Sequence, residues 1–167
     1  MAPQINKKLA LTPKSLAQGG IIAALYAALT LLFAPISFGD IQFRVAEALT
    51  LLPLLTPSAV PGLFVGCLIA NLLASGVGWM DVVFGSLATL LAAVLTRQLR
   101  RFTWLAALMP VLANGLIVGG VLSHVLSLPF LPTACTVALG EAAVCYMLGL
   151  PLINLLRTRV DAKYFED

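Results

Sequence analysis

Two acids and one base lie between two long apolar runs, in the stretch FGDIQFRVAE that occupies residues 38–47. If this stretch continues as a helix into residues 48–52, the i,i+4 and i,i+3 spacings put Asp40, Arg44 and Glu47 on one face. The apolar run that follows would place the carboxylate of Glu47 at the edge of a membrane, where an ionisable side chain is expensive enough to indicate function. These three residues are therefore the first candidates for a binding site.

The chain as a whole is far more apolar than a soluble domain. Of its 167 residues, 60% are hydrophobic and 10% are charged, and the mean hydropathy is +1.02. Soluble domains carry roughly 25% charged residues. A membrane-spanning helix needs about 20 mainly apolar residues, so six such helices account for most of the length. We therefore expect an all-α integral membrane protein with a single transmembrane domain and no separate soluble catalytic domain.

Apolar runs, prolines and glycines place the six helices. They are expected at about residues 15–34, 43–55, 58–75, 81–97, 103–127 and 133–156. In the third helix Gly62, Gly66, Ala70 and Ala74 repeat every four residues, which allows a neighbouring helix backbone to approach closely.

Six crossings put both termini on the same side of the membrane. Nine of the ten Lys and Arg residues, all except Arg44, then lie on that side. By the positive-inside rule this side is the cytoplasm. We expect a multi-pass protein of the cell membrane with both termini cytoplasmic.

In this topology the polar side chains gather in the outer half of the bundle. The candidate substrate-binding residues are Asp40, Phe43, Arg44, Glu47, Asn71, Asp81, Asn114 and Glu141. An unpaired carboxylate at membrane depth costs a few kcal/mol. Because Arg44 is the one cation in this half of the sequence pattern, either Glu47 or Glu141 is left for a ligand or is protonated.

Several of these residues also have a structural interpretation. Asp81 could serve as a helix N-cap, Asn71 and Asn114 could form hydrogen bonds between membrane helices, and Asp40 could be a solvated loop acid. Four aromatic residues could stack on a flat ligand or belong to an interfacial belt; they are Tyr26, Phe38, Phe43 and Trp79.

Catalytic and metal-binding patterns are missing from the sequence. It contains no phosphate-binding loop, no H-E-x-x-H and no G-x-S-x-G. The three cysteines, Cys67, Cys135 and Cys145, lie in apolar runs without the paired spacing of a metal or redox motif. We therefore expect a protein that is not an enzyme, with no cofactor, no metal and no nucleic-acid partner.

Three segments resemble the QueT family: ISFGDIQFRVAEALTLLP at residues 36–53, PGLFVGCLIAN at residues 61–71 and DVVFGSLAT at residues 81–89. Members of this family are substrate-binding S components of energy-coupling factor (ECF) transporters that import precursors of the modified nucleoside queuosine. The resemblance implies a six-helix bundle with an outward-facing pocket for a 7-deazaguanine-type base or nucleoside. It also implies a transmembrane T component and two ATPase subunits as partners.

The same resemblance extends to the first helix. Ala23, Ala24, Ala27 and Ala28 are similar to the A-x-x-x-A motif by which S components dock on the T component. For the ligand, we expect Glu47 to bind the guanine edge and Glu141 or Asp81 to meet the variable substituent. The alternatives are a vitamin-specific S component, a self-sufficient secondary transporter, and a scaffold subunit that would leave the two buried acids unexplained.

Overall fold

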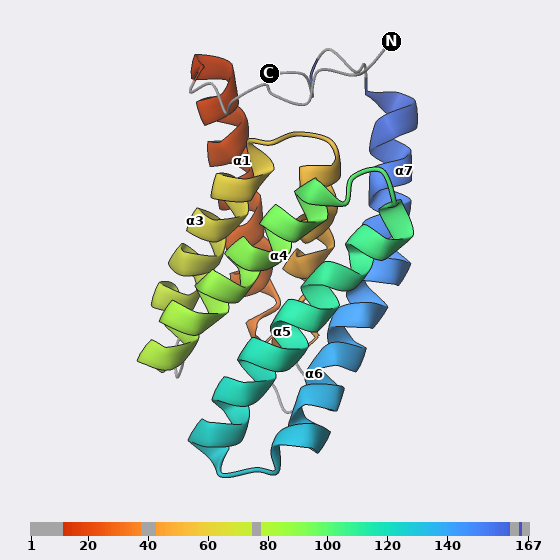
Figure 1. The fold of residues 1–167 in the computed structure, drawn as a ribbon. Helices are drawn as coiled ribbons and strands as arrows, with labels where there is room; N and C mark the ends of the chain where they lie inside the picture. Colours follow the sequence, from red (N-terminus) through yellow and green to blue (C-terminus); the bar gives the residue numbers. More distant parts are fainter. Residues whose placement is uncertain (1–11, 38–42, 75–77, 161–163, 165–167) are drawn as a thin grey trace.

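The computed structural model describes residues 12–37, 43–74, 78–160 and 164, and every regular element in these ranges is helical (Figure 1). The elements are α1 (Pro13–Leu32), α2 (Ala34–Ser37), η1 (Val45–Leu54), α3 (Ala59–Leu73), η2 (Asp81–Gly85), α4 (Ser86–Gln98), α5 (Thr103–Leu126), α6 (Phe130–Val144), η3 (Cys145–Gly149) and α7 (Leu150–Arg159). The predicted all-α fold is thus confirmed for the described residues.

Each predicted helix corresponds to a helical segment whose ends differ by three residues or fewer, with η2 continuing into α4 and α6 continuing through η3 into α7. Within the described ranges, four segments are long and apolar enough to cross a membrane: Pro13–Leu32, Asp81–Gln98, Thr103–Leu126 and Phe130–Arg159. The apolar helices η1 and α3 are shorter, at 10 and 15 residues. Six crossings therefore remain a prediction.

Glycines determine how closely the helices pack. A Cβ atom on Gly62 of α3 would lie 2.6 Å from the carbonyl oxygen of Gly19, and one on Gly66 would lie 2.7 Å from that of Ala23. The predicted close approach along this stripe is confirmed, and the partner is α1. A second close pair joins α5 to α6, where a Cβ on Gly119 would lie 2.7 Å from the Cα of Ala134.

The helix that follows the charged stretch differs from the expected helix in its type and in its first residue. It is a 3-10 helix that begins at Val45, with Arg44 in an extended conformation at its N-cap. The prediction that Arg44 lies on a helical face is therefore wrong, and Asp40 lies outside the described residues. Pro53 lies inside this helix, and its ring would clash with the carbonyl four residues earlier in a regular α-helix.

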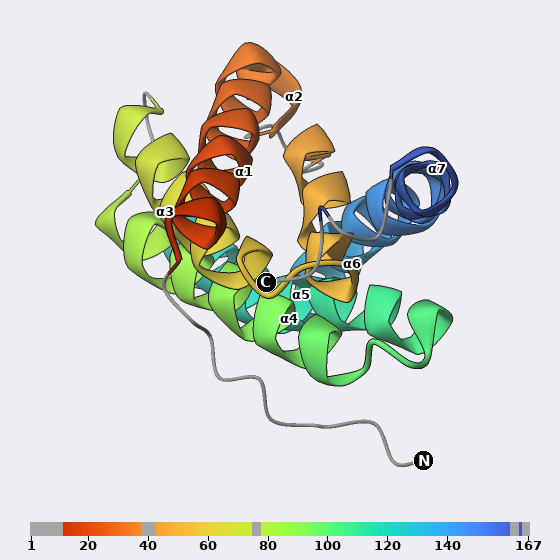
Figure 2. The same cartoon turned by 90° about the horizontal axis from the view of Figure 1, so that it is seen from above.

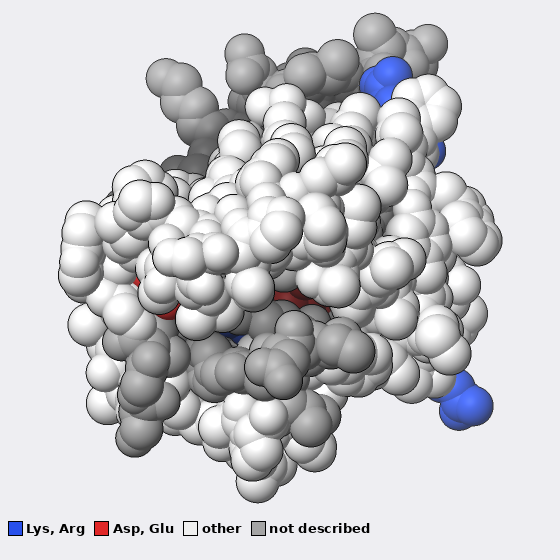
Figure 3. All heavy atoms as spheres, turned by 90° about the horizontal axis from the view of Figure 1, so that it is seen from below, with Lys and Arg blue, Asp and Glu red and all other residues white. Residues whose placement is uncertain are grey.

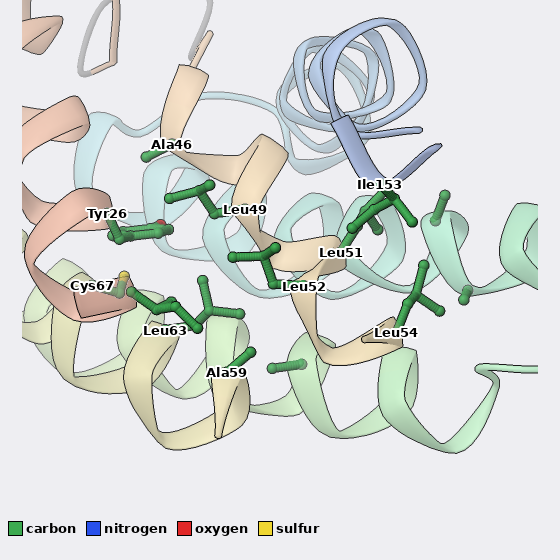
Figure 4. Packing of buried hydrophobic residues seen from close by; sticks show 14 of the residues in the cluster. Tyr26, Ala46, Leu49, Leu51, Leu52, Leu54, Ala59, Leu63, Cys67 and Ile153 are labelled. Atoms are coloured by element: carbon green, nitrogen blue, oxygen red, sulfur yellow. The ribbon is translucent and has the colours of Figure 1, made fainter. Parts of the chain in front are cut away.

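This 3-10 helix is the most enclosed element of the bundle. All residues from Ala46 to Leu54 are buried, and η1 contacts α1, α3, α4, α5, α6, η3 and α7. Figure 4 shows its leucines packed against Leu63 of α3 and Ile153 of α7, and Figure 2 shows η1 between α1 and the α6–α7 segment. Glu47, near its start, is carried into the interior with it.

The beginning of α1, the end of α7 and the α4–α5 turn lie at the same end of the bundle (Figure 1). The Nε2 atom of Gln18 donates a hydrogen bond to the carbonyl of Tyr164, and Arg157 Nη1 donates to Thr103 Oγ1 over 3.4 Å. All described Lys and Arg residues except Arg44 belong to these segments. The predicted clustering of basic residues is therefore present, while the side of the membrane stays a prediction.

Candidate functional site

Glu47 is the most enclosed charged side chain that the structure describes, with 1% of its surface exposed. Its Oε1 atom accepts a hydrogen bond from the Tyr26 hydroxyl and lies 3.8 Å from Arg44 Nη1. Among the described residues, its Oε2 atom has no hydrogen-bond partner. The two oxygens of this carboxylate are therefore unequal: one is held by the protein and the other is available to a donor.

A small cavity lies beside Glu47. It is lined by Arg44, Glu47, Asn114, Val118, Val137 and Glu141. Its free volume is about 10 Å³, which is room for about one water molecule. Figure 3 shows acidic and basic atoms inside a depression on the face opposite to the start of α1.

Four of the predicted site residues meet in this cavity, although they come from three parts of the chain. Arg44 and Glu47 belong to the start of η1, Asn114 to the middle of α5 and Glu141 to α6. Val118 and Val137 complete the wall and pack against Ala88 of α4. The cavity thus combines polar groups with an apolar surface, as small-molecule sites do.

The charges in the cavity do not balance. Glu141 lies close enough to Asn114 and to Glu47 to interact with both, and the Cys145 thiol approaches its Oε1 to within 3.6 Å. Two carboxyl groups thus share one guanidinium. Buried like charges repel strongly, so a positively charged group in the cavity would reduce the repulsion between Glu47 and Glu141.

Asn71 and Asp81 form a separate pair. Asn71 Nδ2 donates to the backbone oxygen of Asp81 over 3.1 Å and lies 3.5 Å from Cys67 Sγ, while its Oδ1 has no partner among the described residues. This contact joins α3 to η2, as the structural interpretation of Asn71 expected. Asp81 is half-buried in the first turn of η2 and interacts electrostatically with Arg44.

Phe43 and the four alanines of α1 are not part of the cavity lining. Phe43 is partly buried just before η1, and Asp40 is not among the described residues. The four alanines of α1 point in two directions: Ala23 and Ala27 are buried, with Ala23 against Gly66 of α3, whereas Ala24 and Ala28 are exposed. A docking role is therefore open to Ala24 and Ala28 alone.

The residue that sequence reasoning missed is Tyr26. Its aromatic ring suggested stacking, but it is its hydroxyl that reaches Glu47. The signal was present, because Tyr26 and Thr30 are the hydroxyl-bearing side chains of the otherwise apolar residues 21–34. In the ranges that the structure describes, no three His, Cys, Asp or Glu side chains gather in a way that could hold a metal ion.

Comparison with known proteins agrees with the resemblance seen in the sequence. A family model described as QueT transporter matches residues 16–158. The queuosine precursor transporter QueT of Lactococcus lactis subsp. cremoris (strain MG1363) is 32% identical over 156 residues, which cover 84% of this chain and 90% of that protein. No solved structure matches the chain.

The family match covers most of the sequence, including the three segments at residues 36–53, 61–71 and 81–89. Its members are transporters, so the prediction that the chain is not an enzyme is confirmed. The apolar helices agree with a multi-pass membrane protein. The chain belongs to the QueT transporter family.

Proposed function

We propose that this chain is the substrate-binding S component of an ECF importer that takes up a queuosine precursor of the 7-deazaguanine type from outside the cell. The observation that carries the proposal is the cavity in which Glu47 and Glu141 share one arginine. The substrate class is supported by the name of the Lactococcus relative.

The chemistry of this ligand class suits the cavity. A 7-deazaguanine ring presents an N–H group beside an exocyclic amino group, and hydrogen bonds from such donors to a carboxylate are of the stronger, charge-assisted kind. Glu47 Oε2 is an unused acceptor, and Glu141 offers a second. An aminomethyl substituent, which is cationic at neutral pH, would balance the excess negative charge, while Val118 and Val137 would pack against the ring.

The cavity has to widen to hold such a ligand. At about 10 Å³ it accommodates about one water molecule, whereas pockets for small organic ligands measure roughly 300–1,000 Å³. Binding therefore displaces lining side chains, and Arg44 is well placed for this because it precedes the helix instead of lying within it. The ligand then replaces the interactions that Arg44 makes with the acids.

The partners in this proposal are a transmembrane T component and two ATPase subunits. Ala24 and Ala28 form a small-residue surface on the exposed face of α1, which suits close approach by another membrane helix. The chain itself has no phosphate-binding loop. The isolated protein in liposomes should bind ligand without accumulating it. Accumulation driven by a proton or sodium gradient would instead identify a secondary transporter.

Isothermal titration of purified protein with a 7-deazaguanine tests the binding role of Glu47. Glu47→Gln keeps the shape of the side chain but places an amide donor where the ligand brings donors. We expect a loss of about 2 to 5 kcal/mol in binding free energy, as for truncated buried charge pairs. Arg159→Gln, at the opposite end of the bundle, should bind like wild type. A folded Glu47→Gln protein that binds within about threefold of wild type, or about 0.6 kcal/mol, would reduce Glu47 to a structural partner of Arg44.

A further inference from the structure

We propose that Tyr26 is a positioning residue that restricts Glu47 to one acceptor atom and so determines how many ligand donors this carboxylate can bind. The inference rests on the proposed function for its ligand class. The inference goes beyond the proposed function because it gives a role in specificity to a residue of α1, a helix that does not line the cavity.

The Tyr26 side chain is held in place by the residues that surround it. None of its surface is exposed, and its ring packs in the same cluster as Leu49, Leu63 and Cys67 (Figure 4). A tyrosine in a closely packed interior has little rotamer freedom. The direction of its hydroxyl, and hence of the hydrogen bond to Glu47, is therefore set by the packing of α1 against α3 and η1.

Because of this hydrogen bond, the two carboxylate oxygens of Glu47 have different surroundings. Oε1 accepts the Tyr26 hydrogen bond and faces Arg44 Nη1 at 3.8 Å, whereas Oε2 has no partner among the described residues. A ligand therefore meets one free acceptor on this side chain. The second donor of a guanine edge has to bind another acceptor of the cavity, such as the side-chain oxygen of Asn114.

Removing the hydroxyl would undo this restriction. In Tyr26→Phe the ring still fills its space, but Oε1 loses its donor and the carboxylate is free to turn. A ligand with two adjacent donors can then bind both oxygens and recover part of the lost affinity. A ligand with a single donor cannot.

Titration with two ligands separates this role from a structural one. On the edge of the six-membered ring, 7-deazaguanine carries an N–H and an amino group, whereas 7-deazahypoxanthine carries the N–H alone; the N–H of the five-membered ring is common to both. We expect Tyr26→Phe to weaken binding of the one-donor ligand by about tenfold and that of the two-donor ligand by less than about threefold, since hydrogen bonds to charged groups have about this strength. Equal loss for both ligands would overturn the proposal.

Tyr146→Phe is the matched control. The Tyr146 hydroxyl donates to the backbone oxygen of Trp104 over 3.0 Å, away from the cavity. This variant removes one tyrosine hydroxyl, as Tyr26→Phe does. It should leave both affinities unchanged.

A second measurement needs no ligand and so judges Tyr26 separately from the proposed function. Thermal unfolding is compared for wild type, Tyr26→Phe, Glu47→Leu and the double variant. If the hydroxyl holds the carboxylate, Tyr26→Phe lowers the unfolding temperature in the wild-type background and hardly at all beside Glu47→Leu. Additive effects would overturn the positioning role. Failure of wild type to bind either deazapurine would count against the proposed substrate alone.

Discussion

At the scale of single residues, the site depends on how the buried acids are compensated. Glu47 has the Tyr26 hydroxyl and Arg44, and Glu141 has Asn114 and the Cys145 thiol. Isolated buried charges are too costly to keep, so such groups are paired, protonated or neutralised by a ligand. Because the cavity holds two carboxyl groups and one guanidinium, we expect the proposed site to prefer a ligand with a positive charge.

Glu141→Gln tests that selection. The change removes one negative charge while keeping the size of the side chain. A 7-deazaguanine with a cationic aminomethyl group should lose about tenfold or more in affinity, because charge-assisted hydrogen bonds contribute about 1.5 to 3 kcal/mol. Unsubstituted, neutral 7-deazaguanine should bind within about threefold of wild type. Calorimetric titration gives both values, and equal losses would mean that Glu141 does not meet the charged substituent.

At the scale of helices, α1 has one buried face and one exposed face. One packs against the glycines of α3 and carries Tyr26 to Glu47. The other is exposed and carries Ala24 and Ala28 together with Ile21 and Leu25. In the proposed complex, the partner helix would therefore pack against the exposed face of the same helix that carries Tyr26.

Gly66→Ala tests the inner face. The new methyl group would lie 2.7 Å from the carbonyl oxygen of Ala23, so α1 and α3 have to separate. Overpacking of this kind costs roughly 1 to 3 kcal/mol, and the unfolding temperature in detergent should fall. Gly20→Ala is the control, since its methyl group would meet nothing within 4 Å. It should be neutral or stabilising, because alanine is the better helix former. Equal changes in the two variants would contradict the close packing.

Ala24→Leu tests the outer face. We expect the larger side chain to prevent close approach by a partner helix, so that assembly with the ECF module and uptake are lost while ligand affinity of the isolated protein stays at the wild-type value. Co-purification and titration measure the two effects. Val125→Leu adds bulk at an exposed position of α5 and should assemble normally. Loss of ligand binding in Ala24→Leu would show that this alanine supports the fold instead.

At the scale of the whole molecule, most of the described basic residues are separated from the cavity that contains Glu47 and Glu141. The beginning of α1, the end of α7 and the α4–α5 turn, which carry the described basic residues other than Arg44, lie at one end of the bundle (Figure 1). Acidic and basic atoms are also visible from the opposite end (Figure 3). By the positive-inside rule we predict that the basic end faces the cytoplasm.

Cysteine labelling tests this orientation. In a background without the exposed Cys135, Gly78→Cys and Ser127→Cys should react with an impermeant maleimide in intact cells. Arg100→Cys, in the turn between α4 and α5, should react after permeabilisation and not before. The reverse pattern would invert the topology and exclude uptake from outside through this cavity.

Much of this protein follows from the sequence alone. The helical segments were predictable to within three residues, because apolar run length and proline and glycine positions are local signals. The contact between Arg44 and Glu47 was predictable as well, since their separation of three residues keeps them together even though Arg44 lies outside the helix. The three QueT-like segments identified the family.

Other features depended on the tertiary structure. The Tyr26–Glu47 bond joins positions 21 residues apart, and the cavity joins η1 to α5 and α6. Which alanines of α1 are buried also depends on packing. The physical reason is that a helix that is apolar on all sides has no polar face to show which side packs inward. The rotation of each helix is then decided by close contacts such as Gly66 against Ala23, and these contacts determine which polar side chains meet.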